Sequence, residues 1–400
     1  MTKSEYMNAL QNKLECFNRE LQQEIVEDYE QHFAEGIAAG KTEEEIVAEL
    51  GSIEDMIQEL PEEDIRHDDQ PLEKGSLDNT YTGEYKAVVI DGGIANVSLR
   101  PSDDGQIHLS YRNDGNELVQ QEYRFYQYEE EGVFYAGVKQ DRNASEKEAK
   151  RAVKIMLFGK TLDLGSFDLE RTFQNIWKGG DSNVRLDVRI PAGMPAVTVK
   201  TVSGNLSVQD VTPQQLDLCS TSGDVEIRHV TVDSLRLNTT SGDVTARQTY
   251  ASDADVHTAS GDVELDDTEV AVLHFEGASG DISGKRVRGT EATIGTGSGD
   301  IELDGCFERY SVRTGSGDVD VRAETGARNI RITTGSGDVE LDVTAVPDTE
   351  VTVGTGSGQA VIYSAGNVRQ QVTRGTCTVG SGDCKVHVNT GSGDAKVRRH

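Results

Sequence analysis

Hydrophobic and polar residues alternate in short runs through the second half of the chain. Val225 and Ile227 are separated by one polar residue, and so are Leu235 and Leu237. A period of two predicts a β-strand with one buried face. The same pair of short runs recurs along the chain, which predicts two strands and two turns in each repeating segment.

The tripeptide Ser-Gly-Asp marks one of these turns. Ser-Gly-Asn starts at 203, and Ser-Gly-Asp starts at 222, 241, 260, 279, 298, 316 and 336, so the first five steps are identical in length. Later copies at 357, 381 and 392 are irregular, which predicts a modified cap at this end. A period near 20 is typical of a solenoid. The expected fold is mainly β: a β-solenoid, or β-helix, with coils of about 19 residues.

The residues of this tripeptide suit a tight structural turn. Glycine supplies a positive φ without a Cβ clash, and Ser and Asp side chains can bond nearby backbone amides. Cation binding by the column of aspartates is the alternative, although calcium prefers about six to eight oxygen ligands. We therefore expect structural turns and no metal site at Gly204, Gly223, Asp224, Gly242, Asp243, Gly261, Asp262, Gly280, Asp281, Gly299, Asp300, Gly317, Asp318, Gly337 and Asp338.

Residues 1–62 have helical periodicity instead, and predict a small all-α domain before the solenoid. Apolar residues recur three or four apart, and Thr2 and Thr42 begin capping boxes. Residues 1–74 carry 21 acidic and 6 basic side chains. We expect an acidic four-helix docking domain over 1–62, a linker over 63–80 and the solenoid over 81–400. A bundle whose charges are merely solvated is the alternative. The apolar faces comprise Met7, Leu10, Leu14, Phe17, Leu21, Ile25, Tyr29, Phe33, Ile46, Leu50, Ile53, Met56, Ile57 and Leu60.

An aromatic-rich insertion or cap is expected at about residues 120–182. Residues 123–177 hold 10 of the 22 aromatic side chains. The candidate interaction surface comprises Tyr126, Tyr128, Phe158 and Trp177. A basic helix over 147–154 leading to an apolar tip could contact a membrane or a partner. Packing of the aromatics over the first coil is the favoured alternative.

Composition limits the classes of function. A net charge of −31 argues against a nucleic-acid partner. No apolar run is long enough to span a bilayer, and the N-terminus lacks a basic start and an apolar segment, so a cytoplasmic protein is expected. The cell surface is the alternative. Cys377 and Cys384 fall at apolar positions of the repeat and should point inward.

An enzyme would need converging catalytic groups. No Gly-x-Ser-x-Gly, phosphate-loop or His-Glu-x-x-His motif occurs. His257 and His274 are separated by less than one full repeat, so we expect that they do not stack. We therefore expect no catalytic residue and no cofactor.

The N-terminal region resembles the bacterial HAAS (DUF1700) helical domain. The resemblance lies in the runs Tyr6–Leu10, Glu27–Phe33, Gly40–Ile46 and Glu49–Ser52. In that family the domain often precedes membrane spans and is associated with PadR-type repressors. The resemblance implies a PadR-like partner for residues 1–62, although this chain has no span.

Residues 85–400 resemble the DUF4097 family, whose members have been named adhesins. Asn96–Pro101, Val188–Pro191 and the Ser-Gly-Asp-Val repeats carry this resemblance. The expected function is a non-enzymatic interaction or scaffold protein, a bacterial regulatory or envelope-stress component whose helical domain docks a protein. A surface adhesin that binds a polymer or host ligand is the first alternative, and a polysaccharide lyase or hydrolase is the second.

Overall fold

The computed structural model describes residues 76–115, 117–140, 154–157, 160–163, 183–364, 368–373 and 375–400, together with isolated positions between Lys3 and Leu50. The chain divides into two compact units, Met1–Leu72 and Glu73–His400. No helix among the described residues is long and apolar enough to span a membrane.

The described positions of the first unit are mostly helical, and they meet in a small core. Tyr6, Met7, Leu10, Phe33 and Ile46 are buried together. The rings of Tyr6 and Phe33 lie 6.0 Å apart in an edge contact. The helical faces predicted around these residues are confirmed where the structure describes them. The expected last helix, over 52–60, lies outside the described residues.

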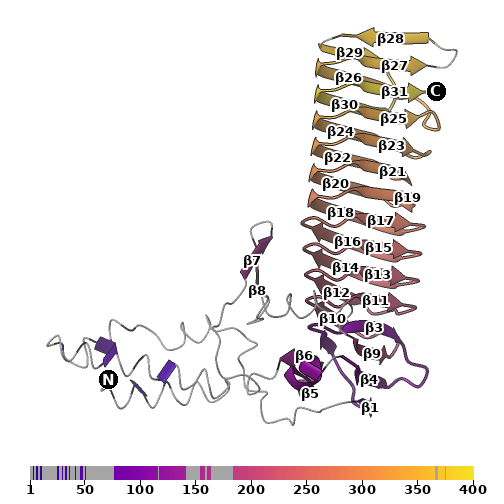
Figure 1. Ribbon diagram of the computed structural model, residues 1–400. Helices are drawn as coiled ribbons and strands as arrows, with labels where there is room; N and C mark the ends of the chain where they lie inside the picture. Colours follow the sequence, from indigo (N-terminus) through magenta and orange to yellow (C-terminus); the bar gives the residue numbers. More distant parts are fainter. Residues whose placement is uncertain are drawn as a thin grey trace. The chain divides into compact units, whose positions relative to one another are not determined.

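The second unit is a β-solenoid built from two stacks of parallel strands (Figure 1). Each regular coil gives one strand to each stack. The first stack contains β10 (Ala196–Thr201), β12 (Gln215–Ser220), β14 (Thr231–Thr239), β16 (Tyr250–Thr258), β18 (Glu269–Ser279), β20 (Glu291–Ser298), β22 (Arg309–Ser316) and β24 (Asn329–Ser336). The second contains β11 (Leu206–Gln209), β13 (Val225–Arg228), β15 (Val244–Arg247), β17 (Val263–Asp266), β19 (Ile282–Arg288), β21 (Ile301–Cys306), β23 (Val319–Ala323) and β25 (Val339–Val343).

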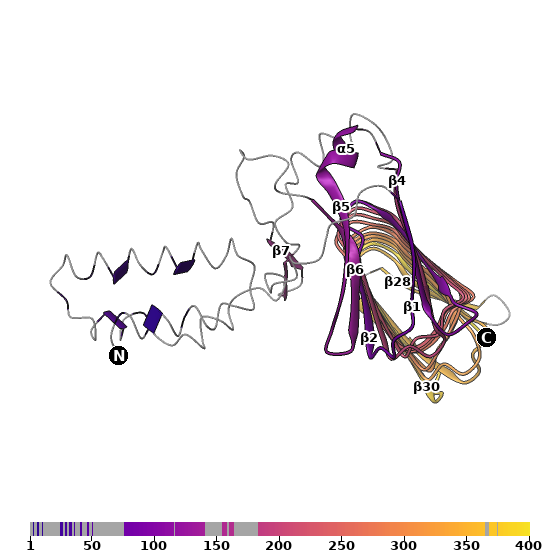
Figure 2. The ribbon, with the colours of Figure 1, turned by 90° about the horizontal axis from the view of Figure 1, so that it is seen from below.

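The core runs as columns of apolar side chains between the two stacks. Leu237 pairs in register with Val256, which pairs with Phe275 and so on along the solenoid. These side chains are all at most 4% exposed. Viewed from below, the strands of successive coils superimpose in two walls that enclose this core (Figure 2). The predicted β-solenoid and its two alternating strands per coil are confirmed.

The N-terminal coils are stacked out of chain order. The coil of β2 (Ala87–Asp91) and β3 (Asn96–Pro101) lies between β10 and β11 on one side and β6 (Val133–Gln140) and β9 (Val184–Ile190) on the other. Antiparallel strands then close both stacks: β5 (Tyr123–Glu130) on β6, and β4 (Ile107–Asn113) followed by β1 (Leu77–Tyr81) on β9. A short helix, α5 (Glu117–Glu122), precedes β5.

Two expectations for this end differ from the structure. Residues 77–80, expected in the linker, belong to β1, because their backbone pairs with β4. Part of the expected basic helix is a strand: β7 (Lys154–Leu157) pairs with β8 (Lys160–Asp163) in a separate antiparallel sheet. The rest of that expected helix lies outside the described residues.

The C-terminal coil is also inserted out of order. The last coil consists of β30 (Cys384–Ser392) and β31 (Ala395–Arg399). On one side it pairs with the coil of β24 and β25. On the other side it pairs with the coil of β26 (Thr349–Ser357) and β27 (Ala360–Ser364), which comes before it in the sequence. The strands β28 (Val368–Val372) and β29 (Gly375–Val379) cover β27 and β26 in antiparallel fashion. The irregular steps near 381 therefore reflect a detour through this cap.

Candidate functional site

The Ser-Gly-Asp corners stack into a hydrogen-bonded column along the solenoid. Oδ1 of each aspartate accepts the backbone amide of the aspartate in the next coil. The amide of Asp243 lies 3.1 Å from Asp224, and that of Asp262 lies 3.0 Å from Asp243. Each exposed carboxylate thus satisfies one backbone donor. In spatial order the column is Asn96, Asn205, Asp224, Asp243, Asp262, Asp281, Asp300, Asp318, Asp338, Asp394 and Gln359.

The corner glycines are required by close backbone approach, and not mainly by a positive φ as we expected. Of the corner glycines from 204 to 337, Gly280 alone has a positive φ, of 126°. A Cβ atom on Gly223 would lie 2.0 Å from the carbonyl oxygen of Gly204, and one on Gly242 would lie 2.0 Å from that of Gly223. Any side chain here would force adjacent coils apart.

The late tripeptide that begins at 381 does not join this column. Asp394 bonds directly to Asp338, and Gln359 bonds to Asp394. Gly382, just before β30, instead lies against the carbonyl oxygen of Asp348, just before β26. In the part of the chain that the structure describes, no three His, Cys, Asp or Glu side chains are placed to hold a metal ion together.

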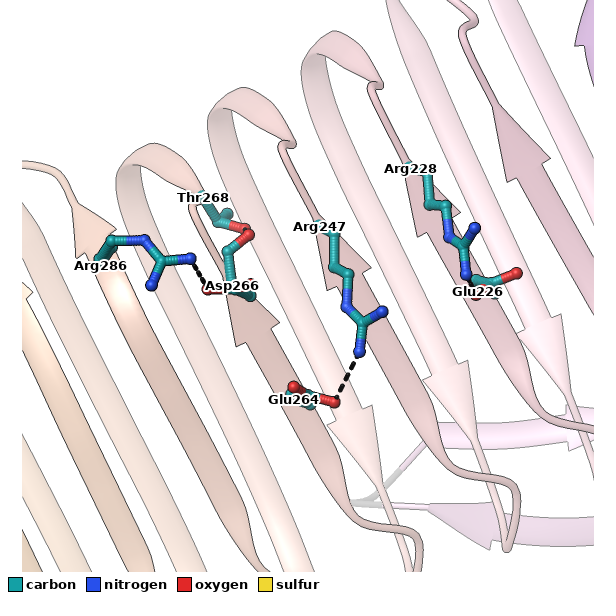
Figure 3. Close-up of polar contacts among 7 residues, drawn as sticks. All are labelled: Glu226, Arg228, Arg247, Glu264, Asp266, Thr268 and Arg286. Atoms are coloured by element: carbon teal, nitrogen blue, oxygen red, sulfur yellow. Dashed lines mark hydrogen bonds and ion pairs between the residues drawn. The ribbon is translucent and has the colours of Figure 1, made fainter.

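Charged side chains pair across coils on the outer face of the second stack (Figure 3). Nη2 of Arg247 lies 3.3 Å from Oε2 of Glu264 on the next coil. Arg286 likewise bonds Asp266 on a neighbouring coil. The side chains of Arg247 and Glu264 are 43% and 42% exposed, and such exposed pairs contribute about 0–1 kcal/mol each. These pairs are therefore solvated surface contacts rather than a main source of stability.

Tyrosine rings of β5 and β6 pack against one another on the outer side of the first stack of strands. The ring centroids of Tyr128 and Tyr135 lie 4.5 Å apart and those of Tyr126 and Tyr128 lie 6.2 Å apart. Nζ of Lys139 lies 5.5 Å from the ring centroid of Tyr126. Burial raises the pKa of Tyr128. The ring faces are thus engaged with one another and with the lysine, which favours packing over a platform for a sugar.

The other two residues of the expected aromatic surface, Phe158 and Trp177, lie outside the described residues. The structure therefore brings Tyr126 and Tyr128 together and adds Tyr135 and Lys139, which the sequence had not singled out. The pairing of β5 with β6 was the missing information, because it places Tyr128 opposite Tyr135.

A tyrosine and a carboxylate fix this cap to the chain before β2. The hydroxyl of Tyr85 donates a hydrogen bond of 2.5 Å to Oε1 of Glu129. The ring of Tyr85 packs against Phe134, with centroids 5.5 Å apart. Burial, together with the charge of Glu129, raises the pKa of Tyr85 to about 12.

The two histidines of the regular coils do not stack, as expected, but their rings meet in an edge contact. The ring centroids of His257 and His274 lie 5.9 Å apart in an edge-to-face arrangement. In the parallel register His257 pairs with Glu276 and Asp255 pairs with His274, so the histidines are diagonal neighbours. A separation of less than one full repeat excludes direct pairing but allows this diagonal contact.

The two late cysteines differ from each other. Cys384 is buried, and burial raises the pKa of its thiol. It points inward as expected and pairs with Thr349 in the first stack, although its place in the repeat had suggested the column of Val225 in the second stack. Cys377 is only partly buried, because it lies on the cap strand β29, and its thiol bonds Oε1 of Gln370.

Solved structures similar to this chain cover most of its length. A protein described as a "putative adhesin" from Parabacteroides merdae is 11% identical, covers 82% of this chain and 96% of its own, and has a TM-score of 0.37. A "putative lipid binding protein" from Parabacteroides distasonis is 12% identical, with coverages of 82% and 98% and a TM-score of 0.35. The comparison with curated proteins found no match.

Two family profiles match the sequence. Residues 5–59 match the HAAS profile. The profile described as Toastrack DUF4097 matches residues 85–285 and 253–398, which together are most of the chain. The two parallel stacks and their glycine corners lie within these matches. The chain belongs to the Toastrack DUF4097 family.

Proposed function

We propose that this protein is a non-enzymatic interaction protein in which the helical unit docks a protein and the solenoid presents a binding face. The observation that carries the proposal is the charged outer face of the second stack. Parallel pairing fixes its strands about 4.8 Å apart, so polar side chains recur at fixed intervals on a rigid surface. Such a surface suits recognition of an extended partner.

The helical unit is the proposed docking element. Its described core consists of Tyr6, Met7, Leu10, Phe33 and Ile46. A unit of this size buries little surface, so contact with a partner would add substantially to its stability. The partner that we propose is a regulator of the PadR type, which the resemblance to the HAAS domain implies. Such a regulator acts on DNA inside the cell, and the proposal places this protein there.

We propose no catalytic role for the solenoid. Its repeated aspartates are engaged as acceptors for backbone amides in successive coils. The arginines and carboxylates of Figure 3 pair with one another. These groups are spread along a face rather than gathered around one point, whereas a hydrolase or lyase needs converging groups.

A surface adhesin is the second candidate, which the resemblance to the DUF4097 family implies. Treatment of intact native cells with an external protease separates the two. The interaction protein should remain whole until the cells are lysed. Digestion of the solenoid on intact cells, with a cytoplasmic marker protein left whole, would contradict our proposal and support the adhesin.

A further inference from the structure

Two arginines face each other on the outer side of the second stack, near its N-terminal end. Arg100 on β3 and Arg189 on β9 are register partners on adjacent parallel strands. Both side chains are exposed. Like charges placed directly opposite on adjacent strands repel each other. A counter-charge from outside would therefore stabilise this arrangement.

This pair differs from three paired arginines of the same face. Arg247, Arg286 and Arg322 each have a carboxylate partner on a neighbouring coil. Within the ranges that the structure describes, neither the Arg100 nor the Arg189 side chain has a hydrogen bond or an ion pair. The chain therefore leaves two adjacent guanidinium groups available, although its net charge is −31.

The charged groups nearest to Arg189 form no ion pair with it. His108, which lies opposite Arg189 on β4, is held by Oδ1 of Asp104 at 2.8 Å and by the hydroxyl of Thr80 at 3.0 Å. Asp187 is the nearest carboxylate along β9, and its charge acts on Arg112, whose pKa is raised chiefly by Asp78.

A hydroxyl without a partner lies at the end of the same strand pair. The amide of Ser102 bonds the carbonyl oxygen of Ile190 at 2.8 Å, which fixes Ser102 beside the residue that follows Arg189. Its Oγ is buried and has no hydrogen-bond partner. A buried hydroxyl left unbonded is costly, so this end of the strand pair carries an unsatisfied polar group.

We propose that Arg100 and Arg189 form a binding site for the phosphoryl group of a phosphomonoester. Two guanidinium groups supply two positive charges and planar forks of donors, which match a phosphate dianion with three acceptor oxygens. A carboxylate would neutralise only one of the two charges. The proposal deepens the proposed function, because it names a ligand chemistry for the binding face of the solenoid.

Titration of the full chain with phenyl phosphate, followed by phosphorus NMR line broadening, tests the site. The native chain should show saturable broadening. The double variant Arg100→Gln/Arg189→Gln should bind at least about tenfold more weakly, because charged hydrogen bonds are lost. The variant Arg100→Lys/Arg189→Lys should fall between them, since it keeps the charge but not the forks. Circular dichroism checks that each variant keeps its β-structure.

Arg331 provides the matched control, because it is an exposed arginine whose register partners are Ser311 and His387. Arg331→Gln should bind phenyl phosphate as the native chain does. Equal binding by the native chain and the double Gln variant would overturn the proposal, and so would equal competition by acetate and by inorganic phosphate. None of these variants alters the helical unit, so failure here is distinguishable from failure of the docking proposal.

Discussion

Replacing Asp262 by Asn and by Ala separates the hydrogen bond of its carboxylate from its charge. Oδ1 of Asp262 accepts the amide of Asp281 at 2.8 Å. Asn retains an acceptor oxygen at this place, as Asn205 does for the amide of Asp224 in the same column. Ala removes the acceptor altogether.

The magnitude follows from the spacing of the column. Carboxylates one strand apart are separated by about 4.8 Å, which in water gives a repulsion of about 0.9 kcal/mol, or about 0.5 kcal/mol after screening by physiological salt. Asp262 has two such neighbours, so Asp262→Asn should raise the free energy of unfolding by up to about 1 kcal/mol. Ala gains the same relief but loses a hydrogen bond worth about 1 kcal/mol, so it should unfold about 1 kcal/mol more easily than Asn.

Urea unfolding of the full chain, followed by circular dichroism of the β-structure, measures this difference. The advantage of Asn over the native residue should shrink as salt is added. Asp253→Asn is the control: Asp253 is exposed on β16, opposite Ser234 and Val272, and should change the free energy by less than about 0.5 kcal/mol. Equal destabilisation by Asn and Ala would refute the reasoning and return support to a bound cation.

Three further predictions concern packing and ionisation. Gly261→Ala places a methyl group 2.0 Å from the carbonyl oxygen of Gly242, so the free energy of unfolding of this variant should fall by about 3 kcal/mol or more. Gly105→Ala is the control: Gly105 has a positive φ but open space around it, so the loss should be about 1 kcal/mol. Val388→Asp puts a charge at a 2% exposed site in the inserted coil. Because this coil joins residues 349–379 to the regular coils, limited proteolysis of the variant should cut first within 349–379. First cuts elsewhere would argue against this order of coils. The phenol of Tyr85 should titrate near its pKa of about 12, above the ordinary 10.0, and Glu129→Gln should lower the midpoint in an ultraviolet titration. Because the pKa of Tyr85 is higher in the folded than in the unfolded chain, neutral Tyr85 stabilises the fold fully below about pH 10, and this contribution is lost as the pH rises to about 12. An unchanged titration midpoint in Glu129→Gln would contradict the link between Glu129 and Tyr85.

The sequence predicts strands well because each needs only a local alternation. Val225 and Ile227 alternate with polar residues, which indicates a strand with one buried face, and both side chains are buried in the structure. The order of coils could not be predicted, because alternation says which face of a strand is buried but not which strand lies beside it. The inserted coil of β30 and β31 is the main example.

The second turn of each coil was predicted, but the left-handed residue within it was not. Asp210, His229, Gln248, Asp267 and Arg286 all have φ between 50° and 60°, and they occupy the same position in successive coils. Aspartate and histidine adopt this left-handed conformation more often than most residues, but Gln and Arg do so less readily. The mixture of residue types at this position therefore gives little indication of a left-handed φ. Only its fixed spacing after the second strand could have indicated it.

The candidate phosphoryl site depends wholly on tertiary pairing. Arg100 and Arg189 are separated by the aromatic-rich region of the sequence, and only the pairing of β3 with β9 places them side by side. Tyr126 and Tyr128, by contrast, were recognisable from composition. Composition finds a cluster within one segment but cannot find a pair made by two distant strands.

Calorimetric titration of the full chain with a purified PadR-type regulator from the same cells tests the central claim most directly. The native protein should bind saturably. Leu10→Asp, which places a charge at a fully buried position of the helical core, should abolish binding while the circular dichroism of the solenoid is retained. Binding that survives in Leu10→Asp, or no binding by the native chain, would contradict the account of the helical unit as a docking element.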